Sequence, residues 1–236
     1  MLTIPATEFV TYALDGHVAT ITFNRPERLN ALLPDMIHTY SDLLDFADAD
    51  PEVRAIVVTG SGRGFCSGAD LSILGEDPEL VQGFLNGQSH RTVPGKYLHL
   101  STPVITAING PAAGLGFVIA MSADFRFAKS DAKLSSTFAR LGLIAEYGIA
   151  WLLPRLVGLA RASDILISGR TFTGEQAAEY GLVLSASDDP LAAAYVCAID
   201  LVRNCSPASM AVIKAQLVRG MNAEFNESAD DAFVEM

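Results

Sequence analysis

Apolar and polar positions near the start of the chain alternate in the way expected for two strands followed by a helix. Phe9–Ala13 and Val18–Phe23 are apolar or alternating runs on either side of Asp15-Gly16. Asp-Gly between two such runs predicts a β-hairpin. A helix is expected from Pro34 to Asp50-Pro51, because proline suits a first helical turn and apolar residues recur there every three or four positions.

Two later strands of buried type each lead into a loop of small residues. Arg54–Thr59 precedes the glycine-rich stretch Gly60–Leu71, and Val104–Ile108 precedes Asn109–Gly116. The second loop leads into the apolar run Phe117–Met121, which predicts a buried helix. Glycines let backbone N–H groups approach a ligand, and a helix N-terminus favours negative charge. Such a turn suits either a bound phosphate or an oxyanion formed during a reaction.

The remainder of the chain changes from alternating strands and helices to mostly helix. This order predicts an α/β core over residues 1–185 and a helical C-terminal region over residues 186–236. Thr173 and Gln176 have the spacing of a capping box. We expect short strands at Phe125–Ala128, at Lys133–Ser136 and from Gly181 to Val183; helices over Ile149–Val157 (interrupted at Pro154), Arg161–Ile167, Glu175–Tyr180, Pro190–Asn204 and Pro207–Arg219; and a weaker helical segment within Glu76–His99.

Length, charge and cysteine content narrow the class of protein. The chain has 236 residues, 50% of them hydrophobic, which fits one large domain with a substantial core. A formal net charge of −11 disfavours a general role on nucleic acid or on an anionic membrane. Three cysteines without C-x-x-C spacing predict neither a disulfide framework nor a metal site. The first residues lack the pattern of a signal peptide, and a cytoplasmic location is expected.

The small-residue turns at Gly68–Asp70 and Ala113–Leu115 are the strongest local signal of chemistry. One such turn alone is equally consistent with an ordinary tight turn in an α/β fold. Two of them could each direct one backbone N–H to the same carbonyl oxygen. Val58–Gly64, VTGSGRG, also suggests dinucleotide binding, but the chain has no Tyr-x-x-x-Lys pair, and it contains no P-loop and no G-x-S-x-G nucleophile motif.

Five motifs in order resemble those of the enoyl-CoA hydratase/isomerase (crotonase) family, from about Phe9 to Lys214. The resemblance implies a spiral of ββα units whose helical C-terminal region makes homotrimers or hexamers. It implies an acyl-CoA thioester as substrate, with coenzyme A carried by the substrate and no other cofactor. Family members usually continue past the equivalent of Met236, so it also implies a chain that is truncated or ends early. The motifs are NRPERLNAL (Asn24–Leu32), GFCSGADL (Gly64–Leu71), AINGPAAGLG (Ala107–Gly116), GLIAEYGIAWLLPRLVG (Gly142–Gly158) and GRTFTGEQAAEYGLV (Gly169–Val183).

Matching the motifs residue by residue assigns roles within a site. The backbone N–H groups of Ala69 and Leu115 fall on the two oxyanion-hole donors of the family, which would hold the thioester oxygen as it gains enolate charge. Arg25 and Arg28 are candidates for the phosphates of coenzyme A. The substrate-binding positions are Arg28, Leu29, Ala69, Asp70, Leu71 and Ser72 for coenzyme A, with Gly114, Val118 and Phe138 nearer the acyl group.

The carboxylates bear on the type of reaction. The two glutamates of family hydratases correspond here to Val118 and Phe138, which carry no proton and are expected to line the acyl pocket. Glu146 lies in LIAEYG, where the dienoyl-CoA isomerases and the ring-opening isomerase of phenylacetate breakdown carry an aspartate. One carboxylate beside an oxyanion hole can move a proton from one carbon to another and so shift a double bond. Without the motif, Glu146 would also fit a carboxylate favoured at a helix N-terminus.

Other functions remain open at this point. Glu146 could support hydration by a non-standard route, or act as base or nucleophile in hydrolysis, dehalogenation or C–C cleavage of an acyl-CoA. The chain could also bind coenzyme A without catalysis. Some family members, including aryl-CoA dehalogenases, use a histidine from the region of His90 and His99, although a lone histidine on a surface helix is more often inert.

Overall fold

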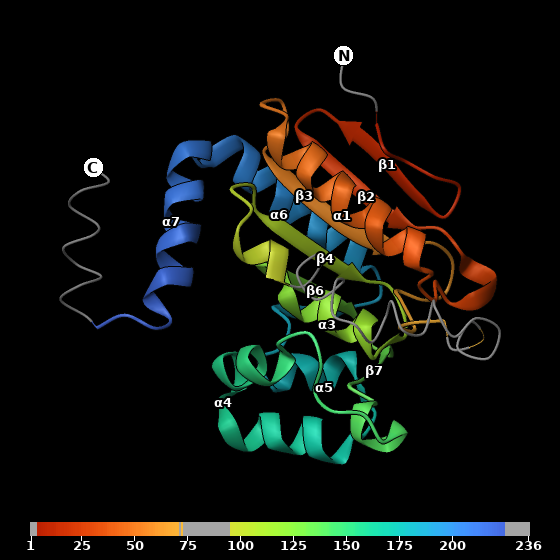
Figure 1. Cartoon of the computed structure of the whole chain (residues 1–236). Helices are drawn as coiled ribbons and strands as arrows, with labels where there is room; N and C mark the ends of the chain where they lie inside the picture. Colours follow the sequence, from red (N-terminus) through yellow and green to blue (C-terminus); the bar gives the residue numbers. More distant parts are fainter. Residues whose placement is uncertain (1–3, 71, 73–94, 225–236) are drawn as a thin grey trace.

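A six-stranded sheet forms the centre of the computed structural model, which describes residues 4–70, 72 and 95–224. Its strand order is β1-β2-β3-β4-β6-β9 (Figure 1). The predicted hairpin is confirmed, since β1 and β2 are antiparallel around Asp15-Gly16 with Val10 opposite Phe23. All other neighbours in this sheet are parallel. The strands are β1 (Val10–Asp15), β2 (Val18–Phe23), β3 (Ala55–Gly60), β4 (Val104–Ile108), β6 (Phe125–Lys129) and β9 (Ser185–Ser187).

Both faces of the sheet are covered, which explains why β3 and β4 are continuous apolar runs. Residues along a strand point alternately to the two faces. Ile56 and Val58 of β3 join the main hydrophobic core with helix α1 (Pro34–Ala49). Ala55 and Val57 join a second core against helix α6 (Pro190–Asn204). The two helices lie on opposite sides of the sheet in Figure 1.

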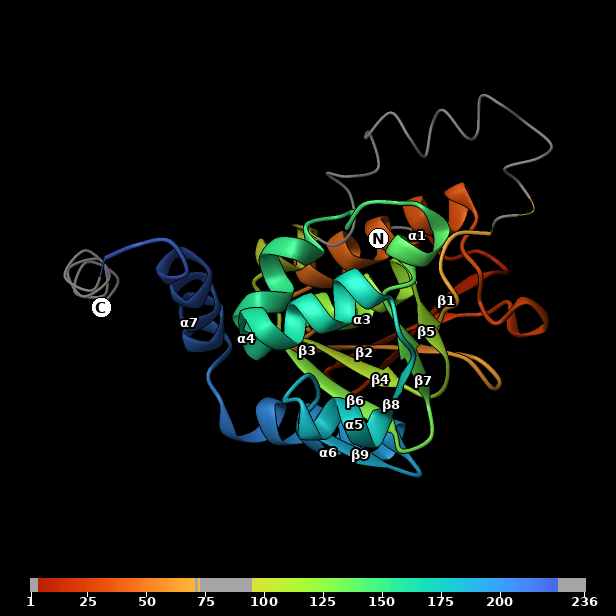
Figure 2. The ribbon, with the colours of Figure 1, turned by 90° about the horizontal axis from the view of Figure 1, so that it is seen from below.

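A small second sheet and a group of helices lie beside the main sheet (Figure 2). This sheet has the order β5-β7-β8 and was not predicted as a unit, because two of its strands are only two residues long. Helix α3 (Leu115–Ser122) is buried at every residue, as its apolar sequence predicts. The other elements here are β5 (Ala112–Ala113), β7 (Lys133–Ser135), β8 (Phe172–Thr173), α4 (Ile149–Ser168), α5 (Gly174–Glu179) and the 3-10 helix η5 (Phe138–Leu141). Two further 3-10 helices are η1 (Pro26–Arg28), which follows β2, and η4 (Gly95–Leu98), which precedes β4.

Two predicted details of the C-terminal half are wrong. The backbone of α4 departs from helical geometry at Gly158 (φ 73°, ψ 161°) and not at Pro154. The segment from Gly181 to Val183 does not begin a strand, because it closes α5. The Gly181 N–H donates to Ala178 O (3.0 Å) and the Leu182 N–H donates to Ala177 O (2.9 Å), which is a Schellman motif. The capping box at Thr173 and Gln176 is confirmed.

Helix α7 (Pro207–Gly220) stands away from the sheet in both views (Figures 1 and 2). It is attached through the buried Lys214, whose Nζ donates to Asp124 Oδ2 (2.7 Å) and Thr102 O (3.1 Å). The division between residues 185 and 186 stays a prediction. Within the described ranges no single helix is long and apolar enough to cross a membrane. The pair α6 and α7, bent by 115°, passes that test of length and composition together.

Candidate active site

The loop containing Gly68, Ala69 and Asp70 lies between two other backbone segments. On one side Cys66 pairs with Ala112 in a parallel bridge. On the other side the Leu32 N–H donates to Gly68 O (2.8 Å), and the Asp70 N–H donates to Leu32 O (3.0 Å). The loop is therefore held by backbone hydrogen bonds along both edges.

This pairing decides where the N–H of Ala69 points. The peptide between Gly68 and Ala69 is trans, so its C=O and N–H point in opposite directions. Because the Gly68 carbonyl is bonded to Leu32, the Ala69 N–H faces away from that segment. The parallel bridge between Leu32 and Ala69 has the same consequence, since only the neighbours of Ala69 bond to Leu32.

The N-terminus of α3 lies next to the peptide between Gly68 and Ala69. Leu115 is the first residue of α3, where N–H groups have no partner within the helix. Gly68 has φ +99°, and a Cβ on it would lie 2.9 Å from Ala113 O and 3.5 Å from Leu115 N. A Cβ on Gly116 would lie 2.1 Å from Cys66 O. Glycine at these two positions lets the segment from Cys66 to Gly68 and the start of α3 lie against each other.

The two positions that correspond to hydratase glutamates are apolar and buried. Val118 follows Leu115 by one turn of α3 and is 0% exposed, and Phe138 at the start of η5 is 4% exposed. Both belong to the main hydrophobic core. Gly114 lies close to this region, because a Cβ on it would be 3.4 Å from Thr137 Oγ1. The acyl-pocket role of these residues stays a prediction.

Glu146 is half-buried on the segment that leads from η5 into α4. Its carbonyl accepts the Ile149 N–H (3.2 Å) at the first turn of α4, and α4 packs against both α3 and η5 (Figure 2). The neighbouring Tyr147 has φ 56°, a rare and strained conformation for a bulky residue. Burial, followed by the negative charge of Glu146, raises the pKa of Tyr147 to about 12. The Glu146 carboxylate and the Tyr147 phenol therefore act on each other electrostatically.

A small cavity of about 80 Å³ lies beside Tyr147, between η4, the end of α3 and the start of α4. A larger one of about 420 Å³ opens at the carboxyl ends of β3 and β4, and none of the predicted site residues lines it. The smaller cavity is lined by Gly95, Leu98, Ser122, Tyr147, Gly148, Trp151 and Leu152.

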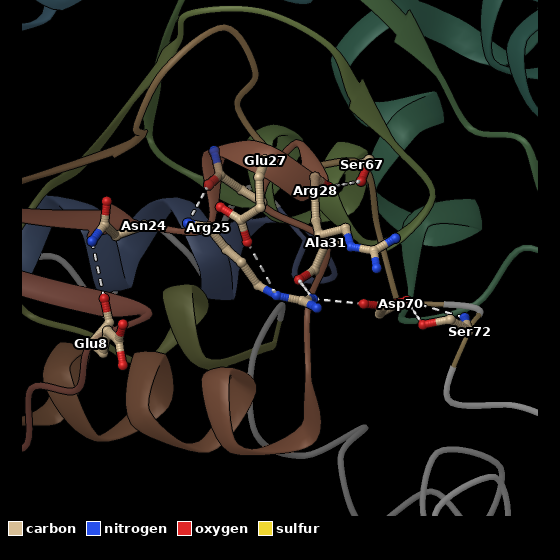
Figure 3. Close-up of polar contacts among 10 residues, drawn as sticks. Glu8, Asn24, Arg25, Glu27, Arg28, Ala31, Ser67, Asp70 and Ser72 are labelled. Atoms are coloured by element: carbon tan, nitrogen blue, oxygen red, sulfur yellow. Dashed lines mark hydrogen bonds and ion pairs between the residues drawn. The ribbon is translucent and has the colours of Figure 1, made fainter. Parts of the chain in front are cut away.

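Arg25, which the sequence made a candidate for a coenzyme A phosphate, forms an ion pair with Asp70 (Figure 3). Its Nη1 donates to Asp70 Oδ2 (2.6 Å) and Ala31 O (3.1 Å). Asp70 Oδ1 accepts from the hydroxyl (2.6 Å) and the N–H (3.1 Å) of Ser72. The hydrogen bond from the Ser72 hydroxyl and the contacts of Arg25 lower the pKa of Asp70 to about 2, although burial opposes the shift. One terminal nitrogen of the Arg25 guanidinium is therefore engaged by groups of the protein, and the phosphate role of Arg25 stays a prediction.

Sequence reasoning assigned no role to Asn30, which is 0% exposed. Its Oδ1 accepts the Arg25 N–H (2.7 Å), and its Nδ2 donates to Ser61 O (3.0 Å) and Gly64 O (2.8 Å). The signal that could have found it is a small polar residue in a turn, where the amide of asparagine often bonds to backbone. The left-handed backbone of Asn30 (φ 57°) fits that signal.

The remaining predicted residues differ in their surroundings. Arg28 is exposed at the end of η1, and Leu29, which follows it, is half-buried. His99 is exposed at the end of η4, whereas Leu71 and His90 lie outside the described residues. Burial raises the pKa of the Cys66 thiol to about 12, which opposes a nucleophilic role at neutral pH. Within the described part of the chain, no group of three or more His, Cys, Asp or Glu side chains could hold a metal ion.

Comparison with known proteins gives consistent matches over most of the chain. A family model described as Enoyl-CoA hydratase/isomerase matches residues 14–232. A 1,2-epoxyphenylacetyl-CoA isomerase of Escherichia coli (strain K12) is 37% identical over 190 residues, covering 77% of this chain and 71% of that protein. A probable enoyl-CoA hydratase of Mycobacterium tuberculosis is 39% identical over 194 residues, covering 78% of this chain and 72% of that protein.

Solved structures match the whole arrangement of helices and strands. A probable enoyl-CoA hydratase/isomerase from Mycobacterium abscessus has a TM-score of 0.86 at 31% identity, covering 97% of this chain and 89% of that one. An enoyl-CoA hydratase from Bacillus anthracis has a TM-score of 0.90 at 28% identity, covering 96% and 89%.

Proposed function

Because the chain belongs to the enoyl-CoA hydratase/isomerase family, we propose that it shifts a double bond in an enoyl-CoA thioester by proton transfer through Glu146. The family acts on acyl-CoA substrates, and the crotonase-like fold expected from the motifs is confirmed. The specific reaction and the roles of the residues are the proposal.

In the proposed reaction, the thioester oxygen accepts hydrogen bonds from the N–H groups of Ala69 and Leu115. The Glu146 carboxylate takes a proton from the α or γ carbon of the substrate. The electron pair of that C–H bond moves into the conjugated thioester, and negative charge collects on its oxygen, where the two donors stabilise it. Protonated Glu146 then returns the proton to the other end of the conjugated system, so the double bond moves and no atom is gained or lost.

The observation that carries this proposal is the identity of residues 118 and 138. Addition of water by the pattern of the family hydratases needs two carboxylates, and these positions hold the buried, apolar Val118 and Phe138. A double-bond shift needs only one carboxylate. Glu146 is half-buried on the segment between η5 and α4, and α4 packs against both η5 and α3. One relative is named 1,2-epoxyphenylacetyl-CoA isomerase, which supports isomerisation of an acyl-CoA as the class of reaction.

The test is a panel of 2-enoyl-, 3-enoyl- and dienoyl-CoA thioesters, assayed by absorbance and by isotope uptake in D₂O. We expect deuterium at the α or γ carbon without addition of water. Glu146→Gln should lower kcat by about 10²–10⁴, the usual contribution of a general acid–base group. Glu179→Gln, at an exposed position on α5, is the matched control and should keep the wild-type rate.

Other outcomes would point to the alternatives. Rapid formation of 3-hydroxyacyl-CoA would contradict the single-carboxylate argument. An acyl group trapped covalently on Glu146 would indicate hydrolysis or a related reaction. If every activity survived Glu146→Gln, the residue would have no catalytic role.

We also propose that the chain forms a homotrimer or hexamer, and that it needs no cofactor beyond the coenzyme A carried by its substrate. Large apolar side chains are exposed on three helices, and such surfaces commonly mark subunit contacts. Light scattering after size-exclusion chromatography tests this assembly, and a monomer at micromolar concentration would contradict it. The exposed side chains are Leu159 and Ile167 on α4, Val196 and Ile199 on α6, and Ile213 and Leu217 on α7.

A further inference from the structure

We propose that Arg25 is a positioning residue, which aims the N–H of Ala69 through its ion pair with Asp70. The inference rests on the proposed function, because it assigns the Ala69 N–H to the thioester oxygen. Asp70 is bonded directly to Ala69 in the chain, and Arg25 lies 45 residues away in sequence. Figure 3 shows the Arg25 guanidinium directed at Asp70 from the turn that contains η1.

A single nitrogen of Arg25 bonds to the loop that carries the donor peptide and to the Leu32 segment paired with it. Nη1 donates to the carbonyl of Ala31, which precedes Leu32, and to the carboxylate of Asp70, which follows Ala69. Leu32 and Ala69 are the pair joined by the parallel bridge. Arg25 therefore cross-links the two strands of this short pairing next to the peptide that presents the N–H.

Burial makes this cross-link sensitive to change. The side chains of Arg25 and Asp70 are 14% and 8% exposed. Removing one member of a buried ion pair leaves the other charge without compensation, which is more damaging than replacing both. The charge of Arg25 should therefore affect the reaction by holding Asp70 and Ala69 in position, and not by attracting the substrate.

The backbone of Arg25 is itself held in position by Asn30. Its N–H is bonded to Asn30, and the buried amide of Asn30 is bonded to the carbonyls of Ser61 and Gly64, which follow β3. Ser72 occupies the second oxygen of Asp70. Contacts thus run without a gap from the end of β3 through Asn30, Arg25 and Asp70 to the residue beside the donor.

A positioning role predicts a specific kinetic result for Arg25→Met. Hydrogen bonds that strengthen as charge develops depend on alignment, so kcat should fall by about 10- to 100-fold, less than the loss of a whole donor. KM should stay within about threefold, because Arg25 contacts no substrate in this scheme. Arg63→Met, an exposed arginine on the loop after β3, is the matched control and should keep both constants.

Infrared spectroscopy of a bound acyl-CoA with a ¹³C-labelled thioester carbonyl gives an independent readout. In the wild type the carbonyl band should shift to lower frequency than in the free thioester, and Arg25→Met should lose part of this shift. Glu146→Gln should keep the shift while losing isomerisation, so failure of the proposed reaction can be told apart from failure of this inference. An unchanged band in Arg25→Met would overturn the positioning role.

A double variant separates positioning from folding. Arg25→Met combined with Asp70→Asn removes both charges, so its Tm should recover relative to Arg25→Met alone. Because the cross-link is still missing, kcat and the carbonyl band should not recover. Recovery of kcat together with Tm would show that Arg25 acts only on stability, and would overturn the inference.

Discussion

The two halves of the proposed site are built in different ways. The donor half, around Gly68, Ala69 and the start of α3, consists of backbone segments pressed together and joined by hydrogen bonds and a buried ion pair. The carboxylate half runs from Thr137 to Gly148, and residues 139–144 within it are exposed. A hydrogen bond that must strengthen on one oxygen needs fixed donors. The carboxylate of Glu146 has to reach two different carbons of the substrate in turn. A segment that is less enclosed by the protein leaves room for that movement.

Left-handed backbone at residues other than glycine occurs beside both halves. Thr137 and Tyr147, with φ of 56° each, lie near the two ends of the carboxylate segment, and Leu29 (φ 50°) and Asn30 (φ 57°) lie beside the donor half. Left-handed conformations cost free energy in residues with bulky or β-branched side chains, and they persist where the surrounding structure imposes them. In the donor half the positive φ of Gly68 costs little, because glycine adopts it freely.

The largest effect that would test this comparison is expected from Gly68→Ala. The new Cβ would lie 2.9 Å from Ala113 O in a backbone conformation that suits glycine, so the loop must move away from α3. We expect kcat to fall by about 10²–10³, the value of one lost oxyanion donor, and Tm to fall with it.

Gly16→Ala is the control for that change. Gly16 also has a positive φ (57°), but nothing lies within 4 Å of its Cβ position and it is part of the β1–β2 turn. It should lower the free energy of unfolding by about 1 kcal/mol while kcat is kept. If Gly68→Ala also kept its kcat, close contact between the two loops would not be needed for the reaction.

A second prediction concerns acid stability in the donor half. The pKa of Asp70 is about 2 in the folded protein, against an ordinary value of 3.8. A lowered pKa means that the ionised carboxylate stabilises the fold above about pH 4, and that this contribution is lost as the pH falls through 4 toward 2. Tm of the wild type should therefore decline more steeply over this range than Tm of Asp70→Asn.

The control for acid stability is Asp42→Asn, at an exposed position on α1. Its Tm should follow the wild-type slope between pH 4 and pH 2. Equal slopes for Asp70→Asn and the wild type would mean that the Arg25–Asp70–Ser72 contacts do not hold the donor half together.

The smallest effect is expected in the carboxylate half, from Thr137→Gly. Release of the left-handed strain should outweigh the added freedom of the unfolded chain, so the free energy of unfolding should rise by up to about 1 kcal/mol. Ala139→Gly in η5 is the control, and it should lower stability by about 0.5–1 kcal/mol. Chemical denaturation measures both, and a destabilised Thr137→Gly would contradict the assignment of strain.

Much of the fold could be predicted from local patterns. The hairpin at Asp15-Gly16, helix α1 and the capping box at Thr173 depend on residues within a few positions of one another. The small sheet β5-β7-β8 could not be predicted, because its two-residue strands carry no periodicity and exist only through pairing with distant segments. Leu182 lies in an apolar, strand-like stretch of sequence, but its N–H group donates to a carbonyl of α5 and so ends that helix.

The sequence by itself determined the family and the order of the main elements, and it predicted the two donor residues, because these are carried by contiguous motifs with fixed spacing. It also determined that residues 118 and 138 bear no carboxylate. Only the tertiary structure decided that the guanidinium of Arg25 is bonded to Asp70 and that the side chain of Asn30 accepts the backbone N–H of Arg25. Side-chain partners of this kind are chosen by geometry and burial among residues far apart in the chain, and no local pattern records that choice.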